Sequence, residues 1–389
     1  MKYLLPFLFS TVSLFAQKPA VNEYADIDKK ALQLPDSLTK TTTGIASYIK
    51  ANFKTDREKA RAIFVWTASS ISYDVENMYA INFYETDSAK IGKALRTRKG
   101  ICENYAIVFQ DVCSKSGVAS YVVLGYTKQN GKADYVPHAW CVAMVDTAWY
   151  LFDPTWGSGS TQSGKFVKKI NNEYFMASPT VFIKSHMPFD YLWQLFYYPI
   201  SNQEFYEGRT APNKTKPFFD YADSIRVYAS LSYTEQLSAS SRRIEKNGVK
   251  NSMIFDRLQH IKMEQENEKI KRYNEAAGTY NEGANDYNSF IDYKNKQFSP
   301  SKPDAEIQKM LDLPAHKLKS ARSKIQQIKD PSAHVSSLIA QLSKTIDDLV
   351  GQVQEQQTWL TTYFSKGKSG RKSMFYEKKV SLFGVPLNK

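Results

Sequence analysis

A cysteine, a histidine and an aspartate occur in an order that suits nucleophilic chemistry. Cys102 follows Gly100 and opens an apolar stretch with helical spacing, so we expect it in the first turn of a helix. A thiol at that place faces the positive end of the helix dipole, which stabilises the thiolate. This position alone would equally suit a small buried residue, because a nucleophile also needs a base and a group that orients the base.

His138 is the candidate base among the five histidines of the chain. It opens the segment "HAWCVAMV", and Asp153 closes the segment "WYLFDPTW". Both segments are rich in aromatic and β-branched residues and are predicted as strands joined by the polar "DTA". If they form a hairpin, the midpoint between His138 and Asp153 lies within about one residue of the turn. The two side chains should then be cross-strand neighbours, direct or diagonal, on one face.

This spacing predicts a Cys-His-Asp triad that attacks a carbonyl carbon. Cys102 would attack as the thiolate, and His138 would hold the proton and return it to the leaving amine. Asp153 would fix the imidazole tautomer and stabilise the imidazolium. The backbone N–H of Cys102 would supply part of an oxyanion hole.

A metal site made from Cys102, His138 and Cys141 is an alternative use of these residues. Cys141 lies an odd number of residues from His138 along the strand, so it faces the opposite side and is predicted to be structural. Cys113 is expected in a helix core. His186, in "SHMP", is predicted as a structural histidine in a turn. The sequence carries no nucleotide, flavin or haem motif, so neither a cofactor nor a metal is expected.

The elements that must position the triad can be predicted from local patterns. Helices are expected at 41–53 and 56–70, the second with a capping box formed by Thr55 and Glu58. A polar loop is expected at "ENMYAINFYETDSAK", which runs up to Ile91. After the cysteine-bearing helix come a strand that ends at an Asn-Gly turn and the two strands named above. Helices followed by an antiparallel sheet indicate an α+β domain.

The motifs "GICENYA", "HAW" and "LFDPTWG" resemble, in this order, the transglutaminase-like superfamily, and above all its bacterial and kyphoscoliosis-peptidase-like branch. The resemblance covers about residues 40–205. It implies a papain-like fold, in which a cysteine-bearing helix packs on an antiparallel sheet, with Cys102, His138 and Asp153 as the triad.

The resemblance also leaves some positions open. Asn104 stands where the family commonly has glycine, and Cys141 stands where asparagine often follows the His-Ala-Trp motif. Neither change removes a catalytic atom, but both bear on substrate access. Trp66 is a candidate for the wall of the site or for the oxyanion hole, although a core position in the helix at 56–70 is favoured.

The second half of the chain has the pattern of long helices. Helix formers dominate after residue 215, "SPSKPD" interrupts them, and a further helix is expected at 304–328. We predict an elongated all-α bundle or coiled-coil hairpin at 215–366, after a boundary near 205–215, and then a basic tail at 367–389. Two apolar stripes support this prediction: Ile270, Tyr273, Ala277, Tyr280, Ala284, Tyr287 and Ile291; and Val335, Ile339, Leu342, Ile346, Leu349, Val353 and Leu360.

Length and charge bear on location and partners. A chain of 389 residues predicts two domains. Residues 1–16 are basic and then apolar, which predicts a signal peptide cleaved near Ala16 and a periplasmic or secreted protein with no membrane span after cleavage. The net charge is +13, of which +9 lies from Tyr206 onward (30 basic against 21 acidic residues). A nucleic-acid partner is disfavoured, an anionic envelope partner of the helical domain fits better, and a solvated tail without a partner is favoured over both.

The sequence thus predicts an exported thiol enzyme that acts on amide bonds of proteins or peptides. It would work by hydrolysis or by acyl transfer through a thioester acyl-enzyme, and the residues do not separate these outcomes. The alternative is a non-catalytic binding or scaffold module with the same fold at the cell envelope. The reactivity of Cys102 distinguishes the two hypotheses.

Overall fold

The computed structural model describes residues 23–79 and 85–376 of the chain. The predicted signal peptide at 1–16 and the last part of the basic tail, 377–389, lie outside the described residues. Within the described ranges, no helix contains a stretch long and apolar enough to cross a membrane.

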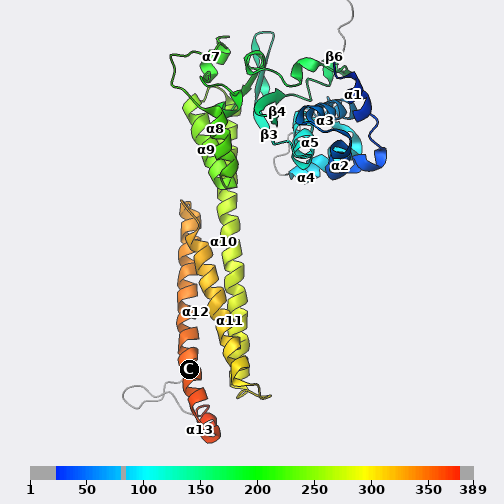
Figure 1. Cartoon of the computed structure of the whole chain (residues 1–389). Helices are drawn as coiled ribbons and strands as arrows, with labels where there is room; N and C mark the ends of the chain where they lie inside the picture. Colours follow the sequence, from blue (N-terminus) through cyan, green and yellow to red (C-terminus); the bar gives the residue numbers. More distant parts are fainter. Residues whose placement is uncertain (1–22, 80–84, 377–389) are drawn as a thin grey trace, which may run out of the picture. The chain divides into compact units, whose positions relative to one another are not determined.

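The chain divides into two compact units (Figure 1). The first runs to Ser230 and also takes in Ser240–Phe255, whereas the second contains Leu231–Ala239 and continues from Asp256. The first unit therefore extends past the segment 205–215, where the sequence suggested a boundary. The core of this unit explains the difference, because Ile225 is buried there in a cluster with Trp193.

Helices precede the sheet in the first unit, as predicted. The second long helix begins with the expected capping box: the Thr55 hydroxyl accepts from the Glu58 N–H, and the Glu58 carboxylate accepts from the Thr55 N–H. The helix that begins at Cys102 packs against three earlier helices and the long central strand. The helices are α1 Ala25–Ala31, α2 Thr42–Asn52, α3 Asp56–Ser70, α4 Asp87–Thr97 and α5 Cys102–Lys115.

Helix α4 was not predicted, and the polar loop expected up to Ile91 ends earlier. The Thr86 hydroxyl accepts from the Ala89 N–H, and the helix starts at Asp87. Its first turn is polar, so apolar residues do not mark where the helix begins. Lys90 is nevertheless buried, because its Nζ forms an ion pair with Glu103 of α5 at 2.6 Å.

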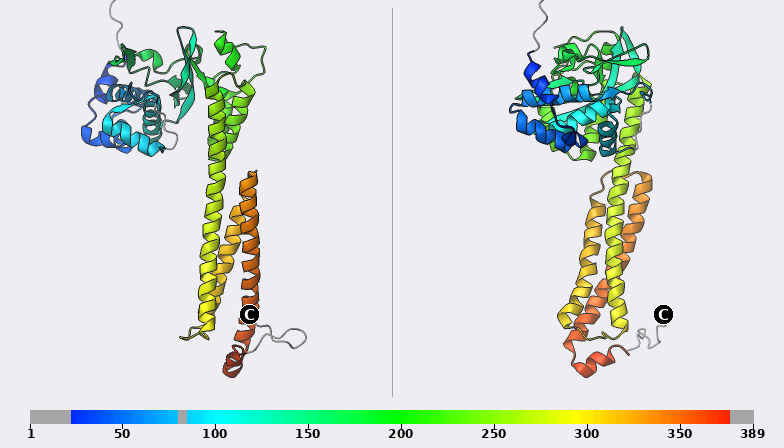
Figure 2. Two further views of the ribbon diagram at one scale, coloured as in Figure 1. Left: turned by 180° about the vertical axis from the view of Figure 1, so that it is seen from behind. Right: turned by 90° about the vertical axis from the view of Figure 1, so that its right-hand side faces the viewer.

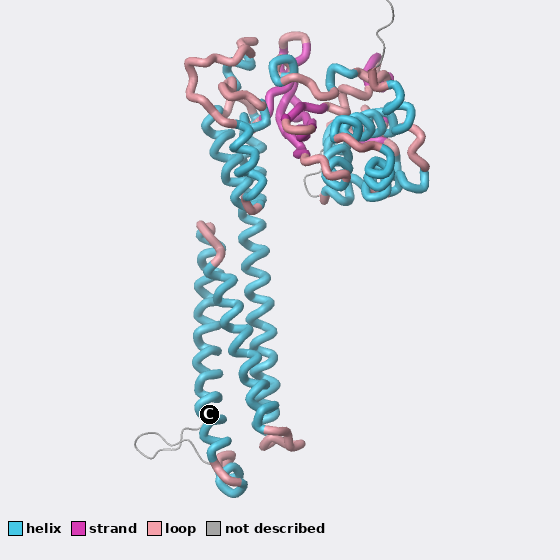
Figure 3. Tube along the Cα trace, viewed as in Figure 1, coloured by secondary structure: helices cyan, strands magenta, loops and turns pink. Residues whose placement is uncertain are grey.

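Strands are coloured magenta in Figure 3. The main sheet has four antiparallel strands in the order β5-β4-β3-β8. Asn130 and Gly131 connect β3 to β4, and both have positive φ values of 51° and 77°, as an Asn-Gly hairpin turn requires. The predicted hairpin of the two following strands is also present. The strands are β3 Ser120–Gln129, β4 Lys132–Val145, β5 Ala148–Phe152 and β8 His186–Pro188.

Strand β8 corrects the prediction of a turn at "SHMP". This segment pairs with β3, so that Thr127 lies opposite His186 and Gly125 lies opposite Pro188. Three residues are too few to show the period-two pattern of a strand. The pairing with a strand some 60 positions earlier in the sequence (186 − 127 = 59) therefore left no local signal.

The two faces of the sheet pack against different layers. Ala139, Cys141 and Ala143 of β4 belong to the core that contains α3 and α5. Trp140 and Val142 alternate with these residues along β4 and therefore lie on the other face of the sheet. They belong to a second core, which they form with the segment that follows the sheet. The small residues on the helical side let α5 lie close to the sheet, which brings its first residue near the strands.

Shorter elements complete the first unit. A two-stranded parallel pair, β1 with β2, precedes α5, and an antiparallel hairpin, β6 with β7, follows Asp153. The bounds are η1 Asp36–Lys40, β1 Ser72–Tyr73, β2 Lys99–Gly100, β6 Gly159–Gln162, β7 Lys165–Lys168, η2 Asn172–Tyr174, α6 Pro179–Phe182, η3 Tyr191–Gln194, α7 Asn202–Tyr206 and α8 Tyr221–Ser230.

The second unit is a helical bundle, as the stripes predicted. Three long helices run side by side in both views of Figure 2, and the predicted helix at 304–328 is present as α11. Most stripe residues are buried or partly buried in one core. Whether the helices supercoil stays a prediction. The helices are α11 Asp304–Gln326, α12 Ala333–Ser365 and α13 Lys368–Ser373, with most of α10 Ser252–Asn295 and the first part of α9 Tyr233–Asn247.

Candidate active site

Cys102 is the first residue of α5 and is partly exposed. The strand pair β1–β2 fixes the chain just before it, since the Asp74 N–H donates to the Gly100 carbonyl at 3.0 Å. The first N–H groups of a helix have no partner within the helix. A negative charge on or near the Cys102 sulfur is therefore favoured at this position.

Asn104 holds this end of α5 in place. Its Oδ1 accepts from the Ile101 N–H at 3.0 Å, and its Nδ2 donates to the Lys90 carbonyl at 3.3 Å. A Cβ atom at Gly100 would lie only 2.6 Å from the Asn104 Cβ. Asn104, which departs from the glycine common in the family, thus has a local structural role.

His138 and Asp153 are diagonal cross-strand neighbours, as predicted. Cys141 lies opposite Phe152, so the same register places Asp153 across from Trp140, two residues from His138. His138 Nε2 and Asp153 Oδ2 are 2.8 Å apart. Because Nε2 faces the carboxylate, Nδ1 is the ring nitrogen left for Cys102, which is among the groups that raise the His138 pKa.

The Asp153 carboxylate is completely buried and accepts four hydrogen bonds. Its Oδ1 accepts from the backbone N–H groups of Thr155 at 2.8 Å and Trp156 at 3.1 Å. Its Oδ2 accepts from the ring nitrogens of His138 at 2.8 Å and His186 at 3.2 Å. A buried carboxylate without such donors would be costly, so the set of donors stabilises the ionised form.

His186 is the site residue that the sequence analysis missed. The sequence predicts a structural histidine in a turn, but β8 places His186 against Asp153. Its ring stacks on Phe182, with 3.9 Å between ring centroids, and lies 4.5 Å from the ring of Trp156. A histidine between "S" and "MP" in an aromatic segment is a weak signal, since its role depends on long-range pairing.

The charges of the site move its pKa values in opposite directions. Burial opposes the charged form of His138, but Asp153 and the contact with Cys102 outweigh burial and raise the His138 pKa to about 10. Burial would likewise raise the pKa of Asp153, but the charge and hydrogen bond of His138, with the hydrogen bond of His186, hold it well below its usual range. Burial lowers the pKa of His186 to about 4, so that ring is neutral.

The other two cysteines, Cys113 and Cys141, are buried in the core. Cys141 donates from Sγ to the Ala106 carbonyl of α5 at 3.2 Å, on the face of β4 opposite His138, as predicted. Burial raises the pKa of both Cys113 and Cys141, which keeps these thiols protonated. All three cysteines are free.

Trp66 lies in the helical core, which the sequence analysis favoured over a place in the site. Only 3% of it is exposed, and the Arg98 guanidinium lies 5.4 Å from its ring centroid. The tryptophan beside the site is instead Trp156, whose ring centroid is 5.7 Å from that of His138.

The alternative of a metal site at Cys102, His138 and Cys141 does not match the geometry, because Cys141 packs on the other face of β4. Within the described residues, the group that brings potential ligand atoms together is His138, Asp153 and His186, whose atoms lie within 4.8 Å of one another. The two histidine–carboxylate hydrogen bonds account for this proximity.

Comparison with known proteins agrees with this geometry. Residues 43–154, which include Cys102, His138 and Asp153, match the family model of the transglutaminase-like superfamily. The chain carries a transglutaminase-like domain. The sequence-based recognition and the papain-like α+β fold class are thereby confirmed. His186 lies beyond the matched residues.

The transglutaminase-like domain has curated relatives in animals. It is 37% identical over 158 residues to the mouse (Mus musculus) protein named kyphoscoliosis peptidase, a match that covers 39% of this chain and 23% of the relative. It is 27% identical over 246 residues to hillarin of Drosophila melanogaster, covering 57% of this chain and 29% of the relative. The chain thus spans about a quarter of the length of these relatives. A solved structure described as a TGase aligns at 18% identity and a TM-score of 0.25, over 41% of this chain and 40% of that one.

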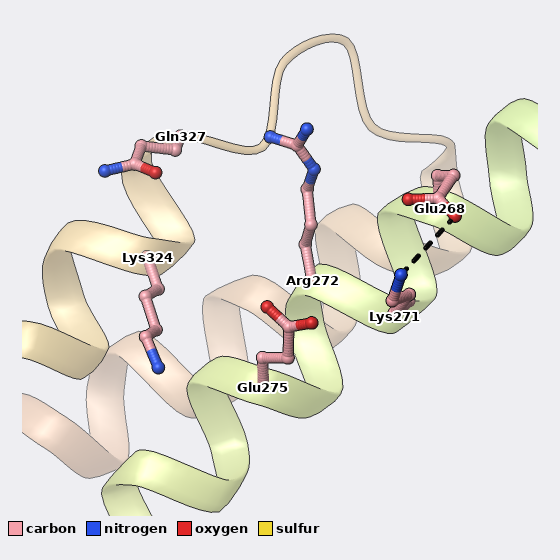
Figure 4. A pocket seen from close by; sticks show the side chains of 6 residues that line it. All are labelled: Glu268, Lys271, Arg272, Glu275, Lys324 and Gln327. Atoms are coloured by element: carbon pink, nitrogen blue, oxygen red, sulfur yellow. Dashed lines mark ion pairs between the residues drawn. The ribbon is translucent and has the colours of Figure 1, made fainter. Parts of the chain in front are cut away.

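A separate pocket of about 300 Å³ lies in the helical unit (Figure 4). It contains charges of both signs, and the Lys271 ammonium lies 3.8 Å from the Glu268 carboxylate. It contains none of the predicted catalytic residues. Its lining residues are Glu268, Lys271, Arg272, Glu275, Lys324 and Gln327.

Proposed function

We propose that the transglutaminase-like domain is a thiol enzyme that breaks or transfers amide bonds of protein or peptide substrates. The observation that supports this proposal is the 2.8 Å contact of His138 with the buried Asp153, together with the effect of Cys102 on the His138 pKa. Transglutaminase-like proteins act on protein substrates, and the match of residues 43–154 to their family model supports the same substrate class here.

Each residue of this line would have a distinct task. The raised pKa of His138 keeps its ring protonated at neutral pH, and an imidazolium beside the sulfur favours the thiolate of Cys102. The thiolate attacks the carbonyl carbon, the N–H groups at the start of α5 face the developing oxyanion, and His138 gives its proton to the leaving amine. Water or a second amine then accepts the acyl group from the thioester.

The location and any further partners are proposals from the sequence. Residues 1–16 have the composition of a signal peptide, which supports export to the periplasm or the medium. The excess of basic residues after Tyr206 supports an anionic envelope surface as a partner of the helical unit.

The activity can be tested with casein as a general protein substrate and a fluorescent primary amine as the acyl acceptor. Amine incorporation measures acyl transfer, and new amino groups, measured without the added amine, report peptide-bond hydrolysis. We expect at least one reaction in the wild type and a loss of about 10³-fold or more in Cys102→Ala and His138→Ala.

A matched control is Cys113→Ala, which removes a buried thiol of the same helix outside the site. It should retain the activity. A wild type that shows neither reaction above the Cys102→Ala background would contradict the proposal, and the non-catalytic scaffold would then be the better hypothesis.

A further inference from the structure

Asp153 is shared between two imidazole rings, and the triad accounts for only one of them. The second ring belongs to His186, of which 1% is exposed. Its Nε2 lies 3.2 Å from the same Oδ2 atom that His138 approaches at 2.8 Å. An extra hydrogen bond on this oxygen changes how strongly Asp153 can hold the proton of His138.

The tautomer of His186 follows from its two neighbours. Asp153 is ionised and can only accept, so the Nε2 of His186 must carry the hydrogen. Its Nδ1 then accepts from the Ser185 hydroxyl at 2.8 Å, a shorter contact than the 3.4 Å between the same hydroxyl and the Phe182 carbonyl. The ring is neutral, and Phe182 and Trp156 hold its plane by ring contacts. His186 is therefore a fixed donor to Oδ2.

The carboxylate itself does not depend on His186 for its position. Its Oδ1 is held by the backbone N–H groups of Thr155 and Trp156, which are set by the turn after β5. Removing the His186 donor would thus leave Asp153 in place but with more negative charge on Oδ2. His138 would then be held more firmly as an imidazolium.

We propose that His186 is a positioning residue that shares the charge of Asp153, so that His138 can release its proton during the reaction. The inference rests on the proposed thiol-enzyme function. A His138 ring held permanently as the imidazolium would favour the Cys102 thiolate but could not serve as the base that activates water or an amine in the second half-reaction. By this account, His186 allows the His138 ring both to favour the Cys102 thiolate and to act as the base in the second half-reaction.

The tyrosines around His138 and Asp153 are neutral at physiological pH. Burial raises the pKa of Tyr73 and Tyr105, and it raises that of Tyr174 to about 12. The charges that act on His138 are therefore those of Asp153 and Cys102, and His186 changes the first of them.

The test compares His186→Phe, which removes the donor and keeps a buried ring, with His186→Gln, whose amide N–H can reach Oδ2. The readout is the rate of Cys102 alkylation by iodoacetamide as a function of pH. In His186→Phe, we expect the acid limb of the profile, where the thiolate is lost, to move to lower pH by about half a unit or more, which is a threefold change. His186→Gln should restore the wild-type profile.

A purely structural role would lower the melting temperature of His186→Phe without moving the acid limb, and this result would overturn the inference. A second measurement needs no variant: ¹⁵N chemical shifts of the histidines in the full-length wild type should report His186 as the neutral Nε2–H tautomer from about pH 5 upward. The Nδ1–H tautomer would also overturn the inference. The ¹⁵N measurement does not depend on the reactivity of the thiol. A failure of the proposed function would instead appear as an unreactive Cys102 in the wild type, so the two failures can be distinguished.

Discussion

At the scale of single residues, the site depends on how one buried carboxylate is satisfied. Asp153 receives two backbone donors on one oxygen and two histidine donors on the other. The sequence was sufficient to predict the pairing of His138 with Asp153, because a hairpin register follows from the turn between its strands. It was insufficient for His186, whose place depends on a strand of three residues.

The ion pair of His138 and Asp153 should make the stability of the first unit depend on pH. The folded pKa of His138 is raised from 6.5 to about 10, so its contribution is complete below about pH 6.5 and is lost as the pH rises toward 10. The folded pKa of Asp153 is lowered from 3.8, so its contribution is present above about pH 3.8 and is lost as the pH falls. The pair should therefore stabilise most between about pH 4 and 6.5.

The corresponding measurement is the free energy of unfolding of the wild type and of His138→Gln by urea titration at several pH values. At pH 5.5 the variant should be less stable by about 1–3 kcal/mol, because Asp153 keeps its other donors. The difference should shrink toward pH 10. His186 is present in both proteins, so its own contribution largely cancels. A difference that grows with pH would contradict this assignment of charges.

At the scale of elements, three features bring the site together: the start of α5, the β4–β5 hairpin and the edge strand β8. Local signals predicted the first two, namely helical periodicity after Gly100 and aromatic-rich segments around a polar turn. Helix α4 and strand β8 were missed for physical reasons. The first turn of α4 is polar and exposed up to the buried Lys90, which pairs with Glu103, and β8 forms only by pairing with a distant strand.

Gly125 is the residue of β3 that allows β8 to approach. It lies opposite His138 on one side and Pro188 on the other, and a Cβ atom there would collide with the Met187 carbonyl oxygen and the Trp140 ring. We expect Gly125→Ala to lower the free energy of unfolding by about 1–3 kcal/mol or more through overpacking. It should also weaken the His186–Asp153 contact, because β8 must shift.

Gly92→Ala is the matched control for this prediction. Gly92 lies in α4 with nothing within 4 Å of the added Cβ, so alanine there should be neutral or stabilising by up to about 1 kcal/mol. Urea titration of both variants gives the comparison. Equal stability of Gly125→Ala and the wild type would show that the β3–β8 contact can relax without cost.

At the scale of the whole molecule, the chain combines a transglutaminase-like domain with a helical bundle. The bundle was predictable because its apolar residues repeat at helical spacing over long stretches. The extent of the first unit was not predictable in the same way. Helix α8 resembles the bundle helices in composition, but its Ile225 is buried with Trp193, and Tyr228 packs edge-on against that tryptophan at 5.4 Å.

The catalytic hypothesis for the whole chain depends on whether the Cys102 sulfur is a thiolate. If Cys102 forms a thiolate–imidazolium pair with His138, the thiol enzyme is supported whatever the substrate. If it does not, the same fold would serve as a scaffold. The two buried cysteines should react slowly in the folded protein, so the modification of Cys102 can be followed on its own peptide by mass spectrometry.

The most direct measurement is therefore the pH dependence of Cys102 alkylation by iodoacetamide in the full-length wild type and in His138→Ala. We predict rapid alkylation below about pH 7 in the wild type, and a shift to the range of an ordinary thiol, about pH 8.5, in His138→Ala. A wild type whose Cys102 reacts only near pH ~8.5, with no change in His138→Ala, would contradict the account.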